Sequence, residues 1–158
     1  MAHVEGEITI DRPIVDVFDF VADGRNEPGY NPNMLRVEQI TAGPIGLGTR
    51  FRAVSLTMGR PVDMENEIVA YDRPHHFEML TSIRAMTIRG RLDFEAIANG
   101  TRMRWSWQIT PHGLYRLMKP LTGRIGNRQE RRIWTGLKRL MESRQLSRLD
   151  ASTMARVP

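Results

Sequence analysis

Histidines are the first candidates for acid or base chemistry in this chain, and there are only four of them. His3 lies near the start, His75 and His76 adjoin in the segment DRPHH, and His112 follows a proline. No HExxH or comparable metal-binding spacing occurs. We therefore predict no metal site and no cofactor, and we expect His75 and His76 to be loop residues.

Carboxylates on alternating positions are the next candidates. Glu65 and Glu67 alternate with Met64, so on a strand they face away from it. Asp93 and Glu95 share a polar face with neighbouring arginines, which favours exposed ion pairs. No carboxylate pair is expected to face inward. The chain also lacks cysteine and a GxSxG motif, so no catalytic residue is assigned.

Asn66 is the polar residue that stands out among apolar neighbours. Alternation along 60–72 places it on the inward face, together with Val62, Met64, Ile68 and Ala70. A buried amide without partners costs about 1 to 3 kcal/mol. Asn66 is therefore either a hydrogen-bonding handle for a ligand or an amide satisfied by water or by a neighbouring strand.

The same alternation predicts a ligand-facing surface across several strands. Trp105 and Trp107 would give it flat aromatic walls, although core tryptophans usually serve packing. The predicted ligand-binding residues are Tyr30, Phe51, Ser55, Met64, Asn66, Phe77, Met79, Thr81, Ile88, Trp105 and Trp107.

These residues need a sheet to position them. Residues 3–10 alternate as a strand, and Asp11 is predicted to cap a helix that begins with DRPIVDVFDFVA. The segment DGRNEPGYNPN interrupts that helix and allows one short turn at 25–29. Alternating segments separated by glycine and proline then predict six strands, at 35–42, 48–58, 60–72, 75–82, 85–97 and 101–111.

The last two strands are apolar on one face and charged on the other, which is typical of an antiparallel sheet with one covered face. The C-terminal segment can supply the cover, since its apolar residues recur at helical spacing. They are Leu114, Leu117, Met118, Leu121 and Ile125, then Ile133, Trp134, Leu137, Leu140 and Met141. We expect one domain over residues 1–148 and a disordered tail at 149–158.

Four stretches carry a resemblance to a known family: ITIDRPIVDVFDFVADGRNEPGYNP, GLGTRFR, GTRMRWSW and LKRLMES. They resemble the START-like superfamily (SRPBCC), in particular its small polyketide cyclase/dehydrase-type proteins, over residues 4–145. The resemblance implies an α+β helix-grip fold. In that fold a seven-stranded antiparallel sheet wraps around a long C-terminal helix, two short helices join the first two strands, and a cavity lies between sheet and helix.

Two functions follow from this resemblance. The first is binding of a small apolar or amphipathic ligand, such as a lipid, a polyketide or an aromatic metabolite, in the cavity. The alternative is a cofactor-independent cyclase or dehydratase that acts on a polyketide-like substrate there. The residues favour binding, because no acid–base pair is expected on the inward face. Where the family often has tryptophan near the end of the second helix, this chain has Tyr30.

Charge is concentrated near the C-terminus. Residues 1–111 carry a net charge of −3, whereas residues 112–148 carry +8. This basic segment is either a solvated helix face or a weak contact with anionic membranes. Nucleic acid is not expected, because RIGNRQERR holds no aromatic residue for base stacking. The N-terminus shows no targeting signal and no window reaches the length of a membrane span, so a cytoplasmic location is expected.

Overall fold

The computed structural model describes residues 2–114 and 122–154. The strands are β1 (Ala2–Ile10), β2 (Met34–Gln39), β3 (Arg50–Thr57), β4 (Arg60–Asp72), β5 (His76–Ile83), β6 (Met86–Ile97) and β7 (Gly100–Pro111). The helices are α1 (Ile14–Ala22), the 3-10 helix η1 (Gly24–Gly29) and α2 (Thr122–Met154). The strands form one antiparallel sheet in the order β1-β7-β6-β5-β4-β3-β2.

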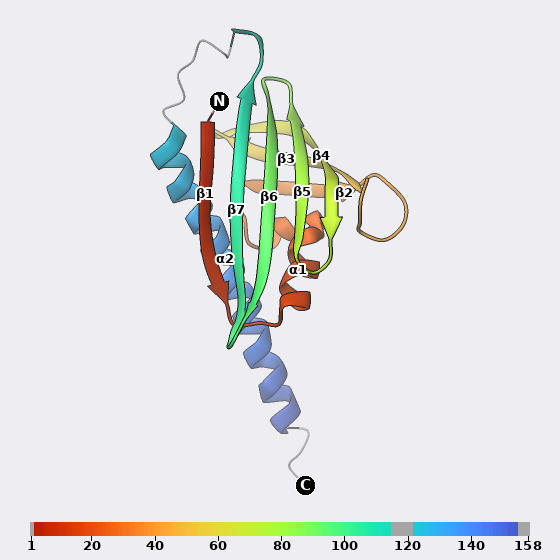
Figure 1. Ribbon diagram of the computed structural model, residues 1–158, viewed down its shortest axis with the longest axis vertical. Helices are drawn as coiled ribbons and strands as arrows, with labels where there is room; N and C mark the ends of the chain where they lie inside the picture. The colour runs from red at the N-terminus through yellow and green to blue at the C-terminus, as the bar shows by residue number, and fades with distance from the viewer. Residues whose placement is uncertain (1, 115–121, 155–158) are drawn as a thin grey trace.

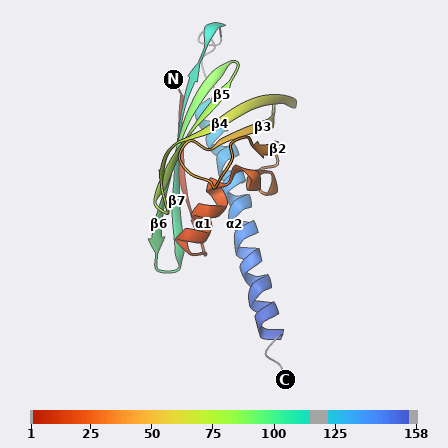
Figure 2. The ribbon, with the colours of Figure 1, turned by 90° about the vertical axis from the view of Figure 1, so that its right-hand side faces the viewer.

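The sheet curves around the long helix (Figures 1 and 2). In Figure 2, α1 lies between the lower part of the sheet and α2, and α2 continues beyond the sheet toward the C-terminus. The predicted helix-grip fold, with two short helices between the first two strands, is confirmed.

Helix α2 covers the sheet with the apolar stripe predicted from its second half. Ile133, Trp134, Leu137 and Met141 are buried. Leu114 is 83% exposed, so its predicted place on this stripe is wrong. The predicted contributions of Leu117, Met118 and Leu121 and of the Ile125 side chain lie outside the described residues. The helix runs to Met154, into the segment expected to be a disordered tail.

The turn before α1 is built differently from the prediction. The N-cap position belongs to Pro13 and carries no side-chain cap, so the assignment of Asp11 as the cap is wrong. The backbone N–H of Asp11 instead donates to the carboxylate of Glu142 on α2, at 3.0 Å. Arg12 is buried and donates to the backbone carbonyl of Met141 at 3.0 Å. This turn therefore ties the N-terminal part of the chain to α2.

A bulge in β4 changes which residues face the core. The register with β5 shifts between Ile68 and Ala70, so that Ala70 lies opposite Glu78 and Tyr71 lies opposite Phe77. The prediction that Ala70 faces inward is therefore wrong, because the extra residue reverses the alternation beyond it. Tyr71 takes the inward position, and its ring centroid lies 5.3 Å from that of a phenylalanine on α1.

An aromatic cluster fills the core where α1 meets the sheet. The ring of Phe18 lies 5.6 Å from Phe77 and 5.1 Å from Phe94, in edge-on arrangements. Aromatic pairs prefer this geometry because the positive ring edge meets the negative ring face. Leu92 and Met103 are buried in the same cluster. We refer to the part of the inner face formed by Phe77, Leu92, Phe94 and Met103 as the packed end.

Helix α2 approaches the end of η1 very closely at Gly136. A Cβ atom at this position would lie 2.7 Å from the backbone carbonyl oxygen of Tyr30. Backbone cannot move aside as a flexible side chain can. The glycine is therefore required by the contact between α2 and η1, although glycine weakens a helix interior by about 1 kcal/mol relative to alanine.

We predict that Gly136→Ala destabilises the protein, because the steric conflict with Tyr30 outweighs the gain in helix propensity. The expected loss in the free energy of unfolding is about 1 to 2 kcal/mol, measured by urea denaturation. Gly46→Ala is the matched control, since a Cβ atom there meets nothing within 4 Å. An equal or higher stability of Gly136→Ala would contradict the prediction.

Candidate functional site

Two tryptophans lie flat against glycines of the neighbouring strands. Trp105 is paired with Gly6 of β1, and Trp107 is paired with Gly90 of β6. A Cβ atom at either glycine would overlap the facing indole ring. The two glycines therefore make room for both rings on the inner face of the sheet.

A third tryptophan, Trp134 of α2, packs against Trp105 and Trp107. The ring centroid of Trp134 lies 5.7 Å from that of Trp105 and 6.5 Å from that of Trp107. Tyr30, at the end of η1, lies 6.0 Å from Trp134. These four rings, which we call the aromatic layer, join the sheet, α2 and η1.

Four buried polar side-chain atoms have no hydrogen-bond partner among the described residues. Three belong to the sheet, the indole Nε1 atoms of Trp105 and Trp107 on β7 and the Oδ1 atom of Asn66 on β4, and the fourth is Asn127 Oδ1 on α2. Asn66 is 5% exposed and lies opposite Phe51 and Thr81. Such atoms carry a desolvation cost of about 1 to 3 kcal/mol each when unpaired, so a polar partner at this site would be favourable.

Two partly buried carboxyl groups lie beside the aromatic layer. Glu130 of α2 accepts a hydrogen bond from Trp134 Nε1 at 3.0 Å. Burial raises its pKa, while this bond and the nearby indole N–H of Trp107, which falls short of hydrogen-bond geometry, act in the opposite direction. Glu27 of η1 accepts a hydrogen bond from Asn31 at 2.8 Å. Burial raises the pKa of Glu27 to about 7, and the nearby charge of Glu130 adds to this rise.

Tyr30 stays a neutral phenol in this setting. Its side chain is buried, and burial raises its pKa well above the ordinary value. The charges of Glu27 and Glu130 act in the same direction. Its hydroxyl group is therefore a hydrogen-bond donor at any physiological pH.

The structure places Tyr30 at the end of η1 and the other predicted ligand-binding residues on strands of the sheet. Asn66, Thr81 and Ile88 lie side by side across β4, β5 and β6. Phe51 and Phe77 are fully buried within the core. The others divide into buried residues, Tyr30, Ser55 and Trp105, and half-buried residues, Met64, Met79 and Trp107. Thr81 and Ile88 are also half-buried, so the inner face is less covered here than at the packed end.

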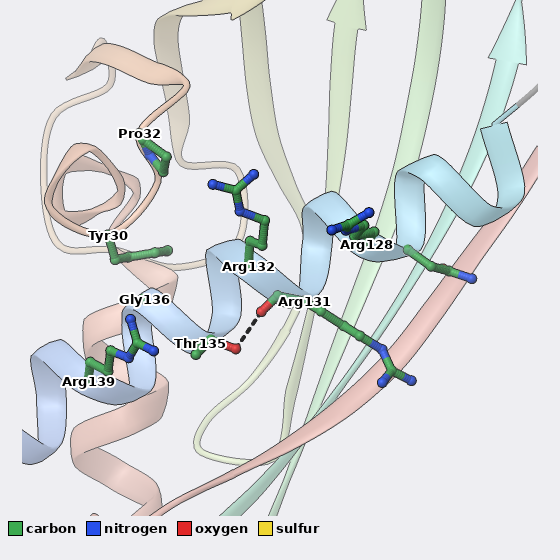
Figure 3. Close-up of a pocket in the computed structure, with 9 residues that line it drawn as sticks. Tyr30, Pro32, Arg128, Arg131, Arg132, Thr135, Gly136 and Arg139 are labelled. Atoms are coloured by element: carbon green, nitrogen blue, oxygen red, sulfur yellow. Dashed lines mark hydrogen bonds between the residues drawn. The ribbon is translucent and has the colours of Figure 1, made fainter.

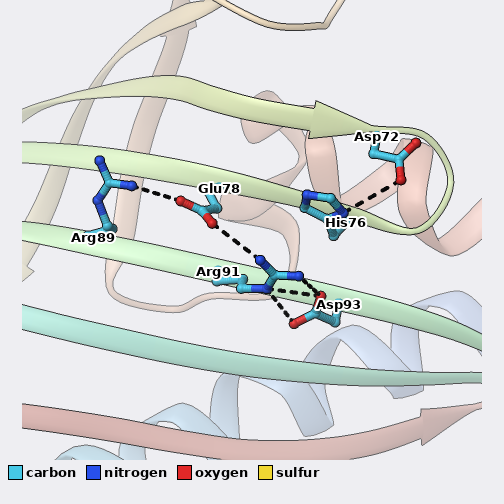
Figure 4. Close-up of polar contacts among 6 residues, drawn as sticks. All are labelled: Asp72, His76, Glu78, Arg89, Arg91 and Asp93. Carbon is cyan, nitrogen blue, oxygen red and sulfur yellow. Dashed lines mark hydrogen bonds and ion pairs between the residues drawn. The ribbon is translucent and has the colours of Figure 1, made fainter.

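The outer face of the sheet carries ion pairs, as Figure 4 shows. Arg91 contacts Asp93 at 2.7 Å and Glu78 at 3.4 Å, and Arg89 contacts Glu78 at 2.8 Å. Glu95 pairs with Arg102 at 3.1 Å. The interpretation of Asp93 and Glu95 as partners in exposed ion pairs is confirmed.

The histidine pair lies at the edge of this region. His75 is in the turn before β5, as expected. His76 is the first residue of the strand, 3.7 Å from Asp72, so the expectation that it is a loop residue is wrong. Both histidines line a shallow hollow of ≈ 430 Å³ on the charged side of the sheet. Among the described residues, no three histidine or acidic side chains gather as a metal site would require.

A larger pocket lies on the flank of α2 that faces η1 and the start of β2 (Figure 3). Its volume is ≈ 790 Å³. Tyr30 and Pro32 form one wall, and α2 lines the other with Asn127, Arg128, Arg131, Arg132, Thr135, Gly136 and Arg139. We call this the arginine pocket. Of the predicted ligand-binding residues, Tyr30 alone is among the described residues that line it.

Sequence reasoning missed the two carboxyl groups at the aromatic layer. Glu130 could have been found, because it precedes Trp134 by one helical turn and thus falls on the apolar stripe of α2. A carboxylate on such a stripe is a signal for a buried polar site. Glu27 gave no comparable signal, since it lies in an irregular, polar segment.

The comparisons with known proteins agree with the fold. The family described as "Polyketide cyclase / dehydrase and lipid transport" matches residues 1–142. The chain belongs to this family. A search of curated proteins finds no match.

Solved structures with the same fold include several of low sequence identity. A START superfamily protein from Mycobacterium smegmatis is 10% identical, with a TM-score of 0.68 over 90% of this chain and 95% of that one. The protein TTHA0849 from Thermus thermophilus is 19% identical, with a TM-score of 0.71 over 87% and 95% of the two chains. The di-domain ARO/CYC BexL from the BE-7585A biosynthetic pathway is 20% identical, with a TM-score of 0.71 over 90% of this chain and 47% of that chain.

The structure also bears on membrane insertion. Within the described ranges, no helix has both the length and the apolar character needed to cross a bilayer.

We predict that Glu27 makes stability depend on pH. Because the folded protein holds this proton up to about pH 7 whereas the ordinary pKa is 4.5, stability should fall as pH rises from 4.5 toward 7. The expected contribution is about 1 to 3 kcal/mol. Glu27→Gln, which mimics the protonated group, should flatten this slope and be the more stable form at pH 8, as measured by urea unfolding.

The exposed Glu38→Gln change serves as the control and should leave the slope unaltered. The same pH slope in Glu27→Gln as in the unmodified protein would show that the Glu27 carboxyl does not retain its proton.

Proposed function

We propose that the protein binds a small, flat, oxygen-bearing apolar molecule between the inner face of the sheet and α2. The observation that carries this proposal is the group of three unpartnered buried polar atoms, on Asn66, Trp105 and Trp107, among apolar and aromatic surface. The indole N–H groups can donate to carbonyl or hydroxyl oxygens of a ligand, and the amide oxygen of Asn66 can accept from a hydroxyl group.

The chemistry of the layer favours one ligand class over the others. Indole rings present flat surfaces, which suit a fused or conjugated ring system. A plain acyl chain would bury the apolar surface but leave the polar atoms unpaired. A polyketide or an aromatic metabolite therefore fits better than a simple fatty acid, and the family description names polyketides as well as lipids.

We predict that ligand binding will quench the intrinsic fluorescence, because all three tryptophans of the chain belong to the aromatic layer. Titration with a dihydroxyanthraquinone should give saturable quenching with a Kd in the micromolar range, on the order of 8 kcal/mol of binding free energy. Oleate should bind more weakly. N-acetyltryptophanamide corrects for light absorption by the ligand, and quenching that only parallels this reference would contradict the proposal.

We predict that Asn66→Leu will weaken binding of the dihydroxyanthraquinone by about 1 kcal/mol or more, which is about fivefold in Kd. Binding of unsubstituted anthraquinone should not change, since it offers no hydroxyl donor. The melting temperature should stay equal or rise, because the substitution removes a buried unpaired acceptor. A large loss of stability with unchanged affinity would instead identify Asn66 as a structural amide.

One observation favours catalysis at the same site as a second candidate function. The carboxyl group of Glu130 lies at the aromatic layer, and burial raises its pKa, which makes its carboxylate a stronger base than that of an exposed glutamate. In a cyclase or dehydratase, Glu130 would remove a proton next to a substrate carbonyl. The Trp107 indole N–H would stabilise the oxygen that gains negative charge. This donor has no hydrogen-bond partner among the described residues.

The test compares turnover with binding. If Glu130 is the base, Glu130→Gln should reduce ring closure or dehydration of a poly-β-ketone substrate by about 100-fold or more, about 3 kcal/mol in the barrier, with the substrate Kd changed by less than about threefold. Glu142→Gln on the same helix is the control, because Glu142 pairs with Lys138 at 2.7 Å and lies away from the layer. Undiminished turnover in Glu130→Gln would exclude this role.

A further inference from the structure

The arginine pocket gathers positive charge on one side of α2. Arg128, Arg131, Arg132 and Arg139 line it, and all four side chains are exposed. Figure 3 shows Arg132 extending from the helix toward Pro32, so that its guanidinium group lies between α2 and the segment after η1. Arg128 and Arg132 are four residues apart, a spacing at which like charges destabilise a helix.

These four guanidinium groups form no ion pair or hydrogen bond with the side chains that the structure describes. The contrast with the rest of the protein is clear. Arginines of the sheet and of the N-terminal segment are paired in most cases: Arg12, Arg25, Arg50, Arg73, Arg89, Arg91, Arg102 and Arg104 each contact a carboxylate. Among the described residues, eight of the twelve arginines before residue 112 thus contact a carboxylate, whereas none of the four pocket arginines does.

Glu130 and Glu142, the acidic residues of α2 whose side chains the structure describes, are turned away from the pocket. Glu130 bonds to Trp134 at the aromatic layer, on the side of the helix that faces the sheet. Glu142 bonds to Lys138 and to the backbone N–H of Asp11. No carboxylate lines the pocket among the described residues, so its charge is not neutralised from within.

We propose that the arginine pocket binds the phosphate or diphosphate group of a soluble small molecule. Guanidinium groups present forked N–H donors that match phosphate oxygens, and several arginines can share a group that carries more than one negative charge. The neutral hydroxyl of Thr135 and the amide of Asn127 add uncharged polar groups to the lining. Binding would relieve the repulsion between the arginines, so ligand and fold would stabilise each other.

The shape of the site favours a small molecule over a membrane surface. Tyr30 and Pro32 stand opposite the helix and give the pocket two walls, with a volume of ≈ 790 Å³ in the range of small-molecule sites. A flat bilayer would contact the outermost side of a helix. It would not reach into the space between α2 and the segment that holds Tyr30 and Pro32. The proposal does not depend on the apolar ligand proposed above, because it concerns a separate flank of α2 and only Tyr30 belongs to both sites.

The experiment uses sodium pyrophosphate as the probe, in isothermal titration and thermal unfolding, with sodium chloride at equal ionic strength as the reference. We expect saturable binding and a rise in melting temperature with pyrophosphate alone. Arg128→Gln/Arg132→Gln should raise the Kd at least about tenfold. Arg60→Gln/Arg84→Gln is the matched control, because it removes the same charge from exposed arginines with no ion pair among the described residues, and it should leave the Kd within about twofold. Circular dichroism confirms that both variants fold.

Three results would overturn the proposal. The first is pyrophosphate binding that does not saturate or that chloride reproduces. The second is an equal loss of affinity in both double variants, which would mean that only net charge matters. The third is co-sedimentation with phosphatidylglycerol vesicles without any pyrophosphate binding, which would make the pocket a membrane contact. Pyrophosphate binding without anthraquinone binding would support this site and reject the proposed apolar ligand.

Discussion

The seating of α2 on the sheet depends on the contact of Trp134 with Trp105 and Trp107. That contact is available because Gly6 and Gly90 leave no side chain beneath the two sheet indoles. On the other side of the helix, Gly136 allows the backbone of Tyr30 to come close. Both contacts of the helix, with the sheet indoles and with Tyr30, thus depend on glycine, because a Cβ atom would leave no room for them. As a result, the two flanks of α2 have different surroundings. One flank faces buried aromatic rings, and the other faces an open pocket lined by arginine.

This position of the helix also determines its electrostatics. Glu130 is carried into the aromatic layer, where the loss of water raises its pKa and the indole of Trp134 gives it a hydrogen bond. Arg128 and Arg132, on the same two turns, remain exposed. Glu130, which could have neutralised these arginines, therefore lies on the opposite side of α2, toward the sheet. One helix separates its charges according to how far each face is removed from water.

Much of the fold could be predicted from the sequence, because alternation along strands and the spacing of apolar residues in α2 record which side of each element is buried. The six strands after residue 33, the buried Asn66 and the paired carboxylates of the outer face all follow from local pattern. The predictions that were wrong concern features that depend on contacts between residues far apart in the sequence. The bulge that turns Tyr71 inward needs the register of β4 with β5, and the role of Pro13 in place of Asp11 needs the contact with Glu142. The proximity of Glu27 and Glu130 could not be predicted either, because the two residues are far apart in the sequence.

The inner face of the sheet is unevenly filled. Phe77, Leu92, Phe94 and Met103 are nearly inaccessible, whereas Met64, Met79, Thr81 and Ile88 are only half-covered. Protection of backbone amides from hydrogen exchange follows local packing, so the two ends should open with different free energies. Opening confined to the less covered end would leave the aromatic core intact. For the ligand proposed above, entry would then depend on local unfolding of this end and not on the movement of a domain.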